Sequence, residues 1–184
     1  MTNTATATPT PGWSGPPWTA EQTIYFHGGF LSNFAPTPGL LLPFGYHGHI
    51  ENDRLPVASV EHWFQACKVT SRQQFDLILS RPSPVSAKAA GRATPLRPDW
   101  EEVKSEVMLC ALRGKFRLEP YRSGLLLTHP QPLAENSPSD FIWGCRDADG
   151  GHTGANLFGL ALMQVRVELV EELRAQLARP DRGR

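Results

Sequence analysis

The most informative stretch of the chain reads Ser59-Val60-Glu61-His62-Trp63-Phe64-Gln65-Ala66-Cys67-Lys68. Successive residues of an α-helix are turned by about 100°, so the stretch divides into two faces. One face is apolar and carries Val60, Trp63, Phe64 and Cys67. Glu61, Gln65 and Lys68 gather beside it within an arc of roughly 60°. The helix therefore holds a carboxylate, an amide and an amine together at the edge of a core.

Two interpretations of this polar group are open. A carboxylate and an ammonium that are half-buried beside aromatic rings have shifted pKa values, as acid, base or nucleophilic chemistry near neutral pH requires. The alternative is a helix whose Glu and Lys are simply solvated, as most helix charges are. For an isolated helix the second interpretation is favoured, so the rest of the sequence has to decide.

Length and charge limit the classes of function. A chain of 184 residues suits one domain that can bury a core without staples. The 18 acidic and 18 basic residues give a formal charge of zero, and no run of Lys or Arg stands out. A protein held to nucleic acid mainly through phosphates normally shows a basic stripe. If a polynucleotide is the substrate, its recognition should be local.

Cysteines and hydropathy indicate the compartment. Cys67, Cys110 and Cys145 are odd in number and lie in or near apolar segments, which predicts reduced thiols. The chain shows no secretory signal pattern and no run of eighteen apolar residues. We expect a cytoplasmic protein that makes no contact with a membrane.

The pattern along the chain predicts an α+β fold, a mostly helical single domain with a few short strands. Residues 1–20 are rich in Pro and Thr and should be disordered, residues 21–178 should form the domain, and residues 179–184 a flexible C-terminus. Strands are expected at 23–26, near 40–42 and 55–57, and at 133–135. Helices are expected at 59–68, 73–79, 86–90, 98–118, 120–127 and 156–177, with a loop over 137–155.

Local signals refine these helices. Ser59 should cap the first helix, with Glu61 in the first turn where negative charge is favoured. Gly91 should serve as a C-cap for the helix over 86–90. Lys115 and Arg117, near the end of the long helix, are explained by the helix dipole without any ligand.

Cofactor motifs are absent from the sequence. It contains no G-x-G-x-x-G after a strand, no G-x-x-x-x-G-K-[ST], no H-E-x-x-H and no paired C-x-x-C. His47 and His49 could share a strand face, but a metal site needs further ligands. We therefore expect neither a cofactor nor a metal.

A second polar cluster lies late in the chain. Glycines at 150, 151 and 154 precede a helix, and such a helix N-terminus favours a phosphate, although similar loops are more often plain connections. Asp140 and Trp143 add an acid and a stacking surface, which predicts a nucleotide pocket. Arg92 could grip phosphate. Asn33 fits a turn, and Trp100 on its own reads as core.

Taken in order, these motifs resemble the NADAR family over about residues 24–169. The residues that carry the resemblance are Phe30-Leu31-Ser32-Asn33-Phe34, the stretch 59–68, Gly91-Arg92, Asp99-Trp100, Lys115-Phe116, Leu133-Ala134-Glu135, Asp140, Trp143-Gly144 and Asn156-Leu157-Phe158-Gly159. The segment 146–154 gives no clean match, which leaves the departing base open.

The resemblance implies an N-glycosidase for ribosylated or ADP-ribosylated substrates. By similarity, Glu61, Lys68 and Asp140 would be catalytic, with Glu61 as acid or base and Lys68 either as a Schiff-base amine or as an electrostatic group. The residues implied in substrate binding are Asn33, Phe34, Gln65, Arg92, Trp100, Glu135, Trp143, Gly144 and Asn156.

The expected reaction is removal of ADP-ribose from guanine in DNA. One alternative is hydrolysis of phosphoribosylated intermediates of the riboflavin pathway, and another is a binding module for ADP-ribose without turnover. The expected partners are thus an ADP-ribosylated nucleic acid or a ribosylated small molecule, and pairing with an ADP-ribosyltransferase toxin is compatible with the first substrate.

Overall fold

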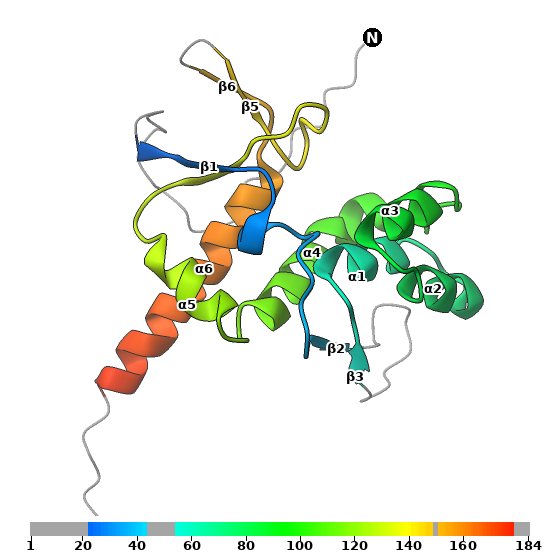
Figure 1. Cartoon of the computed structure of the whole chain (residues 1–184), viewed down its shortest axis with the longest axis horizontal. Helices are drawn as coiled ribbons and strands as arrows, with labels where there is room; N and C mark the ends of the chain where they lie inside the picture. Colours follow the sequence, from blue (N-terminus) through cyan, green and yellow to red (C-terminus); the bar gives the residue numbers. More distant parts are fainter. Residues whose placement is uncertain (1–21, 44–53, 149–150, 179–184) are drawn as a thin grey trace, which may run out of the picture.

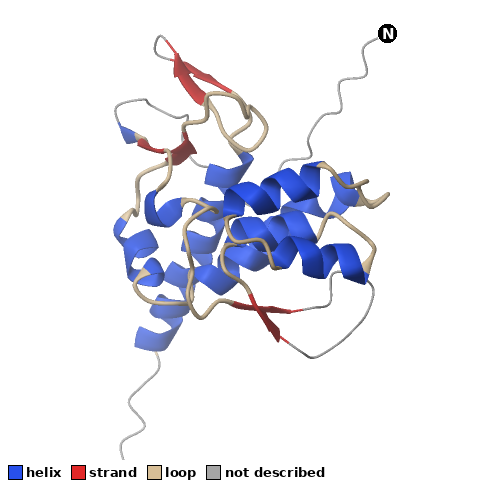
Figure 2. Cartoon of the chain, turned by 45° about the vertical axis from the view of Figure 1, so that its right-hand side comes forward, coloured by secondary structure: helices blue, strands red, loops and turns tan. Residues whose placement is uncertain are grey.

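The computed structural model describes residues 22–43, 54–148 and 151–178. Its helices are α1 (Val60–Ala66), α2 (Arg72–Leu79), α3 (Pro84–Arg92), α4 (Trp100–Lys115), α5 (Tyr121–Leu127) and α6 (Leu157–Leu177), with a short 3-10 turn η2 (Gly29–Leu31). Its strands are β1 (Ile24–Phe26), β2 (Leu41–Pro43), β3 (Arg54–Pro56), β4 (Leu133–Glu135), β5 (Arg146–Ala148) and β6 (Gly151–Thr153). The predicted α+β class is confirmed (Figure 2). The predicted tails at 1–20 and 179–184, with His47 and His49, lie outside the described residues.

Helix α1 is the centre of the helical part of the molecule. The Ser59 side chain accepts a hydrogen bond from the His62 amide, so the predicted cap is confirmed. Every residue of α1 is buried, because α1 packs against α2, α3 and α4 (Figure 1). Trp63 meets Phe75 of α2 edge-on, with ring centroids 5.8 Å apart. The polar groups of α1 are therefore enclosed by other helices.

Three two-stranded sheets surround the helices. Strands β1 and β4 pair in parallel, with Phe26 opposite Glu135, and β4 lies against α6. Strands β2 and β3 pair antiparallel, as the predicted short strands allow. Strands β5 and β6 form a hairpin at the top of Figure 1, inside the segment predicted as a loop. Their three-residue runs, Arg146-Asp147-Ala148 and Gly151-His152-Thr153, lack apolar alternation, so no strand was predicted there.

The core runs along α4 and α6. Trp100, Val107, Ala111, Leu112 and Phe116 are buried on the predicted face of the long helix. The thiols of Cys67, Cys110 and Cys145 are all reduced, in agreement with the prediction. Among the described residues, no helix is both long enough and apolar enough to cross a membrane.

One local prediction is wrong. Gly91 is not a C-cap but an internal residue of α3, whose C-cap is Ala93. Lys115 lies in the last turn of α4, as predicted, but its residue is 0 % exposed, and Nζ donates to the Ser32 carbonyl at 2.7 Å. At both positions packing against a residue distant in the sequence determines the environment.

Candidate active site

The Glu61 carboxyl is the most constrained acid of the described chain. Its residue is 2 % exposed, in the first turn of α1. Gln65 Nε2, one helical turn later, donates to Oε1 at 2.7 Å, and Asn33 Nδ2 donates to Oε2 at 2.5 Å. The Glu61 amide also donates to the Asn33 carbonyl at 2.9 Å. Both carboxyl oxygens are thus fixed by the side-chain amides of Asn33 and Gln65, two residues predicted for this site, and the Glu61 backbone is fixed by the Asn33 carbonyl.

Burial sets the protonation of Glu61. Loss of water raises its pKa from 4.5 to about 7, although the hydrogen bond from Gln65 and the positive charges of Lys88 and Lys68 oppose the rise. Negative charge at this first turn was expected to be favoured by the helix dipole, but the desolvation effect is larger. Glu61 can therefore both give and take a proton near neutral pH.

Lys68 lies just after α1, where the buried helix reaches a half-exposed position. Its Nζ is 5.2 Å from the Phe64 ring centroid and 5.6 Å from that of Trp100. Burial lowers the pKa of Lys68, with Arg92 and Lys88 adding to the decrease while Glu61 and Asp140 oppose it. Part of the amine population is thereby made available as a nucleophile.

Lys88 of α3 belongs to the same cluster, although the sequence analysis did not select it. Its charge acts on Glu61, Lys68 and Glu135, and its Nζ lies 5.3 Å from the Phe34 ring centroid. The only sequence signal is that Lys88 precedes Arg92 by one helical turn. The packing of α3 on α1 is what brings Lys88 to Glu61.

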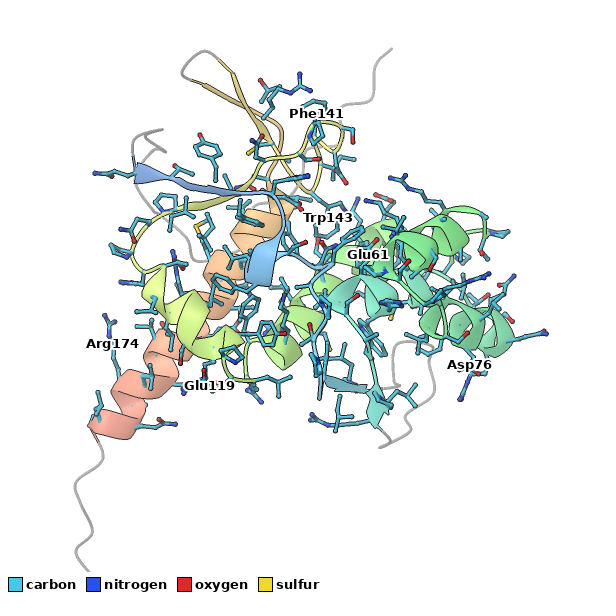
Figure 3. All side chains as sticks on the ribbon, viewed as in Figure 1. Glu61, Asp76, Glu119, Phe141, Trp143 and Arg174 are labelled. Atoms are coloured by element: carbon cyan, nitrogen blue, oxygen red, sulfur yellow. The ribbon has the colours of Figure 1, made fainter. Side chains whose placement is uncertain are left out.

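A turn between β4 and β5 faces α1 from the other side. Asp140 Oδ1 accepts hydrogen bonds from the amides of Ile142 and Trp143, at 3.1 and 2.9 Å. The Trp143 ring then meets Phe64 edge-on at 5.1 Å, and Figure 3 shows Trp143 beside Glu61 with Phe141 farther out. Asp140 thus holds the turn that carries Trp143.

Glu135 and Gly144 lie on the same side of the site as the turn that carries Trp143, and together these residues form one wall of the site. Burial raises the pKa of Glu135, and the Asp140 charge adds to the rise. A Cβ on Gly144 would lie 2.9 Å from the carbonyl oxygens of both Asp140 and Glu135, so only glycine fits there without movement.

Asn156, the N-cap of α6, ties the wall to the helix. Its Oδ1 accepts from the Glu135 amide at 3.1 Å, and its Nδ2 donates to the Leu133 carbonyl at 2.9 Å. Its backbone has φ of 49°, a left-handed conformation that asparagine tolerates. Both ends of the side-chain amide are therefore used in holding β4.

The N-terminus of α6 is not open to an anion, contrary to the sequence prediction. The amides from Ala155 to Phe158 all donate to carbonyls of the turn over residues 141–144, at 2.8 to 3.2 Å. This part of the predicted nucleotide pocket is wrong, because its donors already have partners.

Trp100 and Phe34 frame the cluster. Trp100 is 5 % exposed and meets Phe64 at 5.0 Å between ring centroids, which places it in the core beneath Lys68. Phe34 is half-buried below Lys88. Arg92 is exposed at the last turn of α3. The predicted residues thus form one connected cluster, while their individual roles stay predictions. No group of three His, Cys, Asp or Glu side chains arranged to hold a metal occurs among the described residues.

Comparison with known proteins gives the family. The NADAR domain family matches residues 23–170, which include all of the residues above. The chain belongs to the NADAR domain family. Its resemblance to that family, inferred from the ordered motifs, is thereby confirmed.

Several NADAR relatives are similar over most of their length. N-glycosidase YbiA of Escherichia coli (strain K12) is 38 % identical over 148 residues, which cover 78 % of this chain and 83 % of YbiA. N-glycosidase Npun_R5314 of Nostoc punctiforme is 36 % identical over 160 residues, covering 80 % and 93 %. The NMR structure of E. coli YbiA superimposes with a TM-score of 0.68 at 32 % identity, covering 89 % of this chain and 92 % of that one. The NADAR fold of this chain is therefore that of YbiA.

Proposed function

We propose that this chain is an N-glycosidase that hydrolyses the C1′–N bond of a ribosylated substrate, and that its substrate is ADP-ribose linked to guanine in DNA. The observation that carries the proposal is Glu61, a buried carboxyl with a pKa of about 7 held by two amides beside a lysine amine. The names of the YbiA and Nostoc relatives support the reaction class.

Glu61 performs the proton transfers. In its protonated form it donates a proton to the departing base as the C1′–N bond breaks, and the positive charge that develops on the ribose is stabilised by the resulting carboxylate. The carboxylate then accepts a proton from the attacking water, whose oxygen bonds to C1′. The products are the sugar with a hydroxyl group at C1′ and the free base, and Glu61 is again protonated.

Lys68 can act in two ways, as a neutral amine or as a charged ammonium, and the two differ in their chemistry. As a neutral amine it attacks C1′ in place of water, and the base leaves with the proton from Glu61. The C1′–O4′ bond of the resulting ribosylamine then breaks with protonation of O4′, and water hydrolyses the imine so formed to the free sugar and the amine. As an ammonium it stabilises the Glu61 carboxylate or a phosphate. We favour the imine, because burial beside Phe64 and Trp100 lowers the pKa of Lys68.

Lys88 and Arg92 hold the phosphate in this proposal. Neither side chain has an ion-pair partner within the described ranges 22–43, 54–148 and 151–178, although acids lie near enough to influence them. An anionic ligand is the natural neutraliser of two neighbouring cations on one helix. The Trp143 ring would stack on the base or the sugar.

The assignment to DNA rests on the family resemblance and on the surface next to Trp143. Phe141 and Ile142 are 42 % and 55 % exposed, and the Arg146 guanidinium lies 5.6 Å from the Phe141 ring centroid. An exposed ring with a cation over it suits an unpaired base that flanks the modified guanine. An ADP-ribosyltransferase would then be the enzyme that supplies the substrate.

A riboflavin-pathway substrate is the second candidate. It is favoured by riboflavin biosynthesis protein VVA0006 of Vibrio vulnificus, 34 % identical over 169 residues, and by PYRR of Zea mays, 33 % identical over 157 residues. The match covers 82 % of this chain and 40 % of the first protein, and 77 % of this chain and 23 % of the second, so most of this chain corresponds to one part of those proteins.

One assay separates the candidates. The protein is incubated in parallel with an oligonucleotide that carries ADP-ribosylguanine and with phosphoribosylated riboflavin intermediates, and the released sugar phosphate and base are quantified by chromatography. Faster release of ADP-ribose supports the DNA assignment, and faster cleavage of the intermediates replaces it. Binding without release from any substrate would contradict catalysis and indicate a binding module.

A further inference from the structure

Lys115 is the one fully buried lysine of the described chain, and the proposed reaction does not use it. Its residue is 0 % exposed, at the end of α4. Its Nζ lies 5.2 Å from the ring centroids of both Phe116 and Tyr121. Its Nζ donates a hydrogen bond to a backbone carbonyl, that of Ser32, at 2.7 Å. No carboxylate among the described residues lies within ion-pair distance of it.

Such an amine is costly to bury. Removal from water lowers the pKa of Lys115 to about 7, and no neighbouring charge offsets this effect. A methionine would fill the same space without that cost. The hydrogen bond to Ser32 is therefore the feature that distinguishes lysine at this position.

The accepting carbonyl is next to the residue that grips the acid. Ser32 is followed by Asn33, whose side-chain amide donates to Glu61 Oε2 and whose carbonyl accepts from the Glu61 amide. The same loop is held at Pro36, whose carbonyl accepts from the Tyr121 hydroxyl at 2.6 Å. A continuous path of hydrogen bonds and covalent bonds thus runs from α4 through Ser32 and Asn33 to Glu61.

We propose that Lys115 is a positioning residue, which holds the Ser32 carbonyl so that the Asn33 amide stays on the Glu61 carboxylate. The claim about position concerns the free protein, and its consequence for turnover rests on the N-glycosidase function proposed above. Lys115 touches no substrate; it acts through Asn33.

The test combines Lys115→Met, Asn33→Ala and the double variant. The titration of Glu61 is followed by carboxyl carbon NMR in the absence of substrate. A hydrogen bond to a carboxylate favours its charged form, so loss of the Asn33 contact should raise the pKa of Glu61 by about one in each single variant. If Lys115 acts through Asn33, the double variant should equal Asn33→Ala, whereas a purely electrostatic influence of the lysine would add to it.

Turnover supplies the second readout. On a substrate that the wild type cleaves, Lys115→Met should lower kcat about ten- to a hundredfold with little change in KM, since the acid is displaced while the binding surface remains. Because the NMR titration needs no turnover, inactivity of the wild type would contradict the proposed function and leave the positioning result readable.

Arg166 of α6 gives a matched control. It is a second buried cation, 4 % exposed, and its Nη1 donates to the Thr128 carbonyl at 2.8 Å, in contact with neither Asn33 nor Glu61. Arg166→Met should lower thermal stability and leave the Glu61 titration unchanged. If Lys115→Met does the same, Lys115 is only structural and the proposal is overturned. Should Lys115→Met fail to fold, Tyr121→Phe removes the other anchor of the loop, and an unshifted Glu61 in that variant would count against the proposal.

Discussion

Gly91 of α3 lies directly against Gln65 of α1, so that a Cβ on Gly91 would be 2.9 Å from Gln65 Cβ and 3.1 Å from Gln65 Cδ. Gln65 in turn donates to the Glu61 carboxyl. The absence of one side chain on α3 therefore determines where the acid on α1 is held.

Gly91→Ala should be destabilising, against the usual trend in helices. In a helix interior this exchange normally stabilises by about 1 kcal/mol, but overpacking a filled contact costs about 1–3 kcal/mol. We expect a lower free energy of unfolding in urea and a lower kcat, because Gln65 has to move from Glu61. The exposed Ala89→Gly in the same helix serves as the control for propensity alone. A variant more stable than the wild type, with full turnover, would show that Gln65 adjusts freely.

Glu61→Gln should lose activity and gain relative stability at alkaline pH. Removing a positioned acid should reduce turnover at least about a hundredfold. Because folding raises the pKa of Glu61 from 4.5 to about 7, the folded wild type binds more protons than the unfolded chain between these values. Its free energy of unfolding therefore falls as pH rises through that window, by about 3 kcal/mol in total.

The variant lacks this loss, so its stability relative to the wild type should increase between pH 4.5 and pH 8. Urea unfolding of both proteins at several pH values measures the difference, in which contributions from other groups cancel. In Glu61→Gln, Gln65 Oε1, which has no hydrogen-bond partner among the described residues of the wild type, can accept a hydrogen bond from the amide introduced at position 61 after the Gln65 side chain flips. A difference that stays constant with pH would mean that folding does not raise the pKa of Glu61.

Borohydride should trap Lys68 on a substrate that turns over. Reduction of an imine converts it to a stable secondary amine, detected as a mass increase of the protein and located by peptide mapping. Lys68→Arg keeps the charge, cannot form this adduct, and provides the control. If the wild type turns over without any adduct while Lys68→Arg remains active, the lysine acts only through its charge.

Lys88→Met and Arg92→Met should weaken phosphate binding. Each substitution should raise KM about tenfold with kcat nearly unchanged, the pattern of a group that binds ground state and transition state alike. The comparison is made with the ADP-ribosylated substrate and with the same substrate after treatment with a pyrophosphate hydrolase and then a phosphatase, on which the variants should match the wild type. Arg72→Met, which removes an exposed cation paired with Asp76 on α2, controls for net charge. Equal effects on both substrates would show that Lys88 and Arg92 do not act by binding the phosphate.

The local sequence pattern was sufficient to predict helix α1 and half of the candidate site. Helical periodicity correctly separated the apolar face from Glu61 and Gln65, and the spacing of four residues placed their side chains in contact. Contacts across 28 residues, such as Asn33 with Glu61, have no local signal. Asn33 entered the predicted site only through the family resemblance, as a substrate-binding residue, and its contact with Glu61 was not predicted.

The errors and omissions share one physical cause. Lys115 and Gly91 each had a sound local explanation, by the helix dipole and by capping, yet each is determined by a neighbour from another element. Lys88 was missed for the same reason, since its place beside Glu61 depends on how α3 packs on α1. The amides that begin α6 were expected to be available to an anion. Their carbonyl partners lie in a separate turn, so no local signal in the sequence indicated them.

The hydrogen bonds of those amides position the Trp143 turn separately from the hairpin that follows it. The turn that carries Trp143 is fastened to the first residues of α6, so its position is independent of the length of the β5–β6 hairpin that follows it. The hairpin can therefore change in length or sequence without moving Trp143 or the turn that Asp140 holds. Insertions at this place should be tolerated without a change in the surroundings of Glu61.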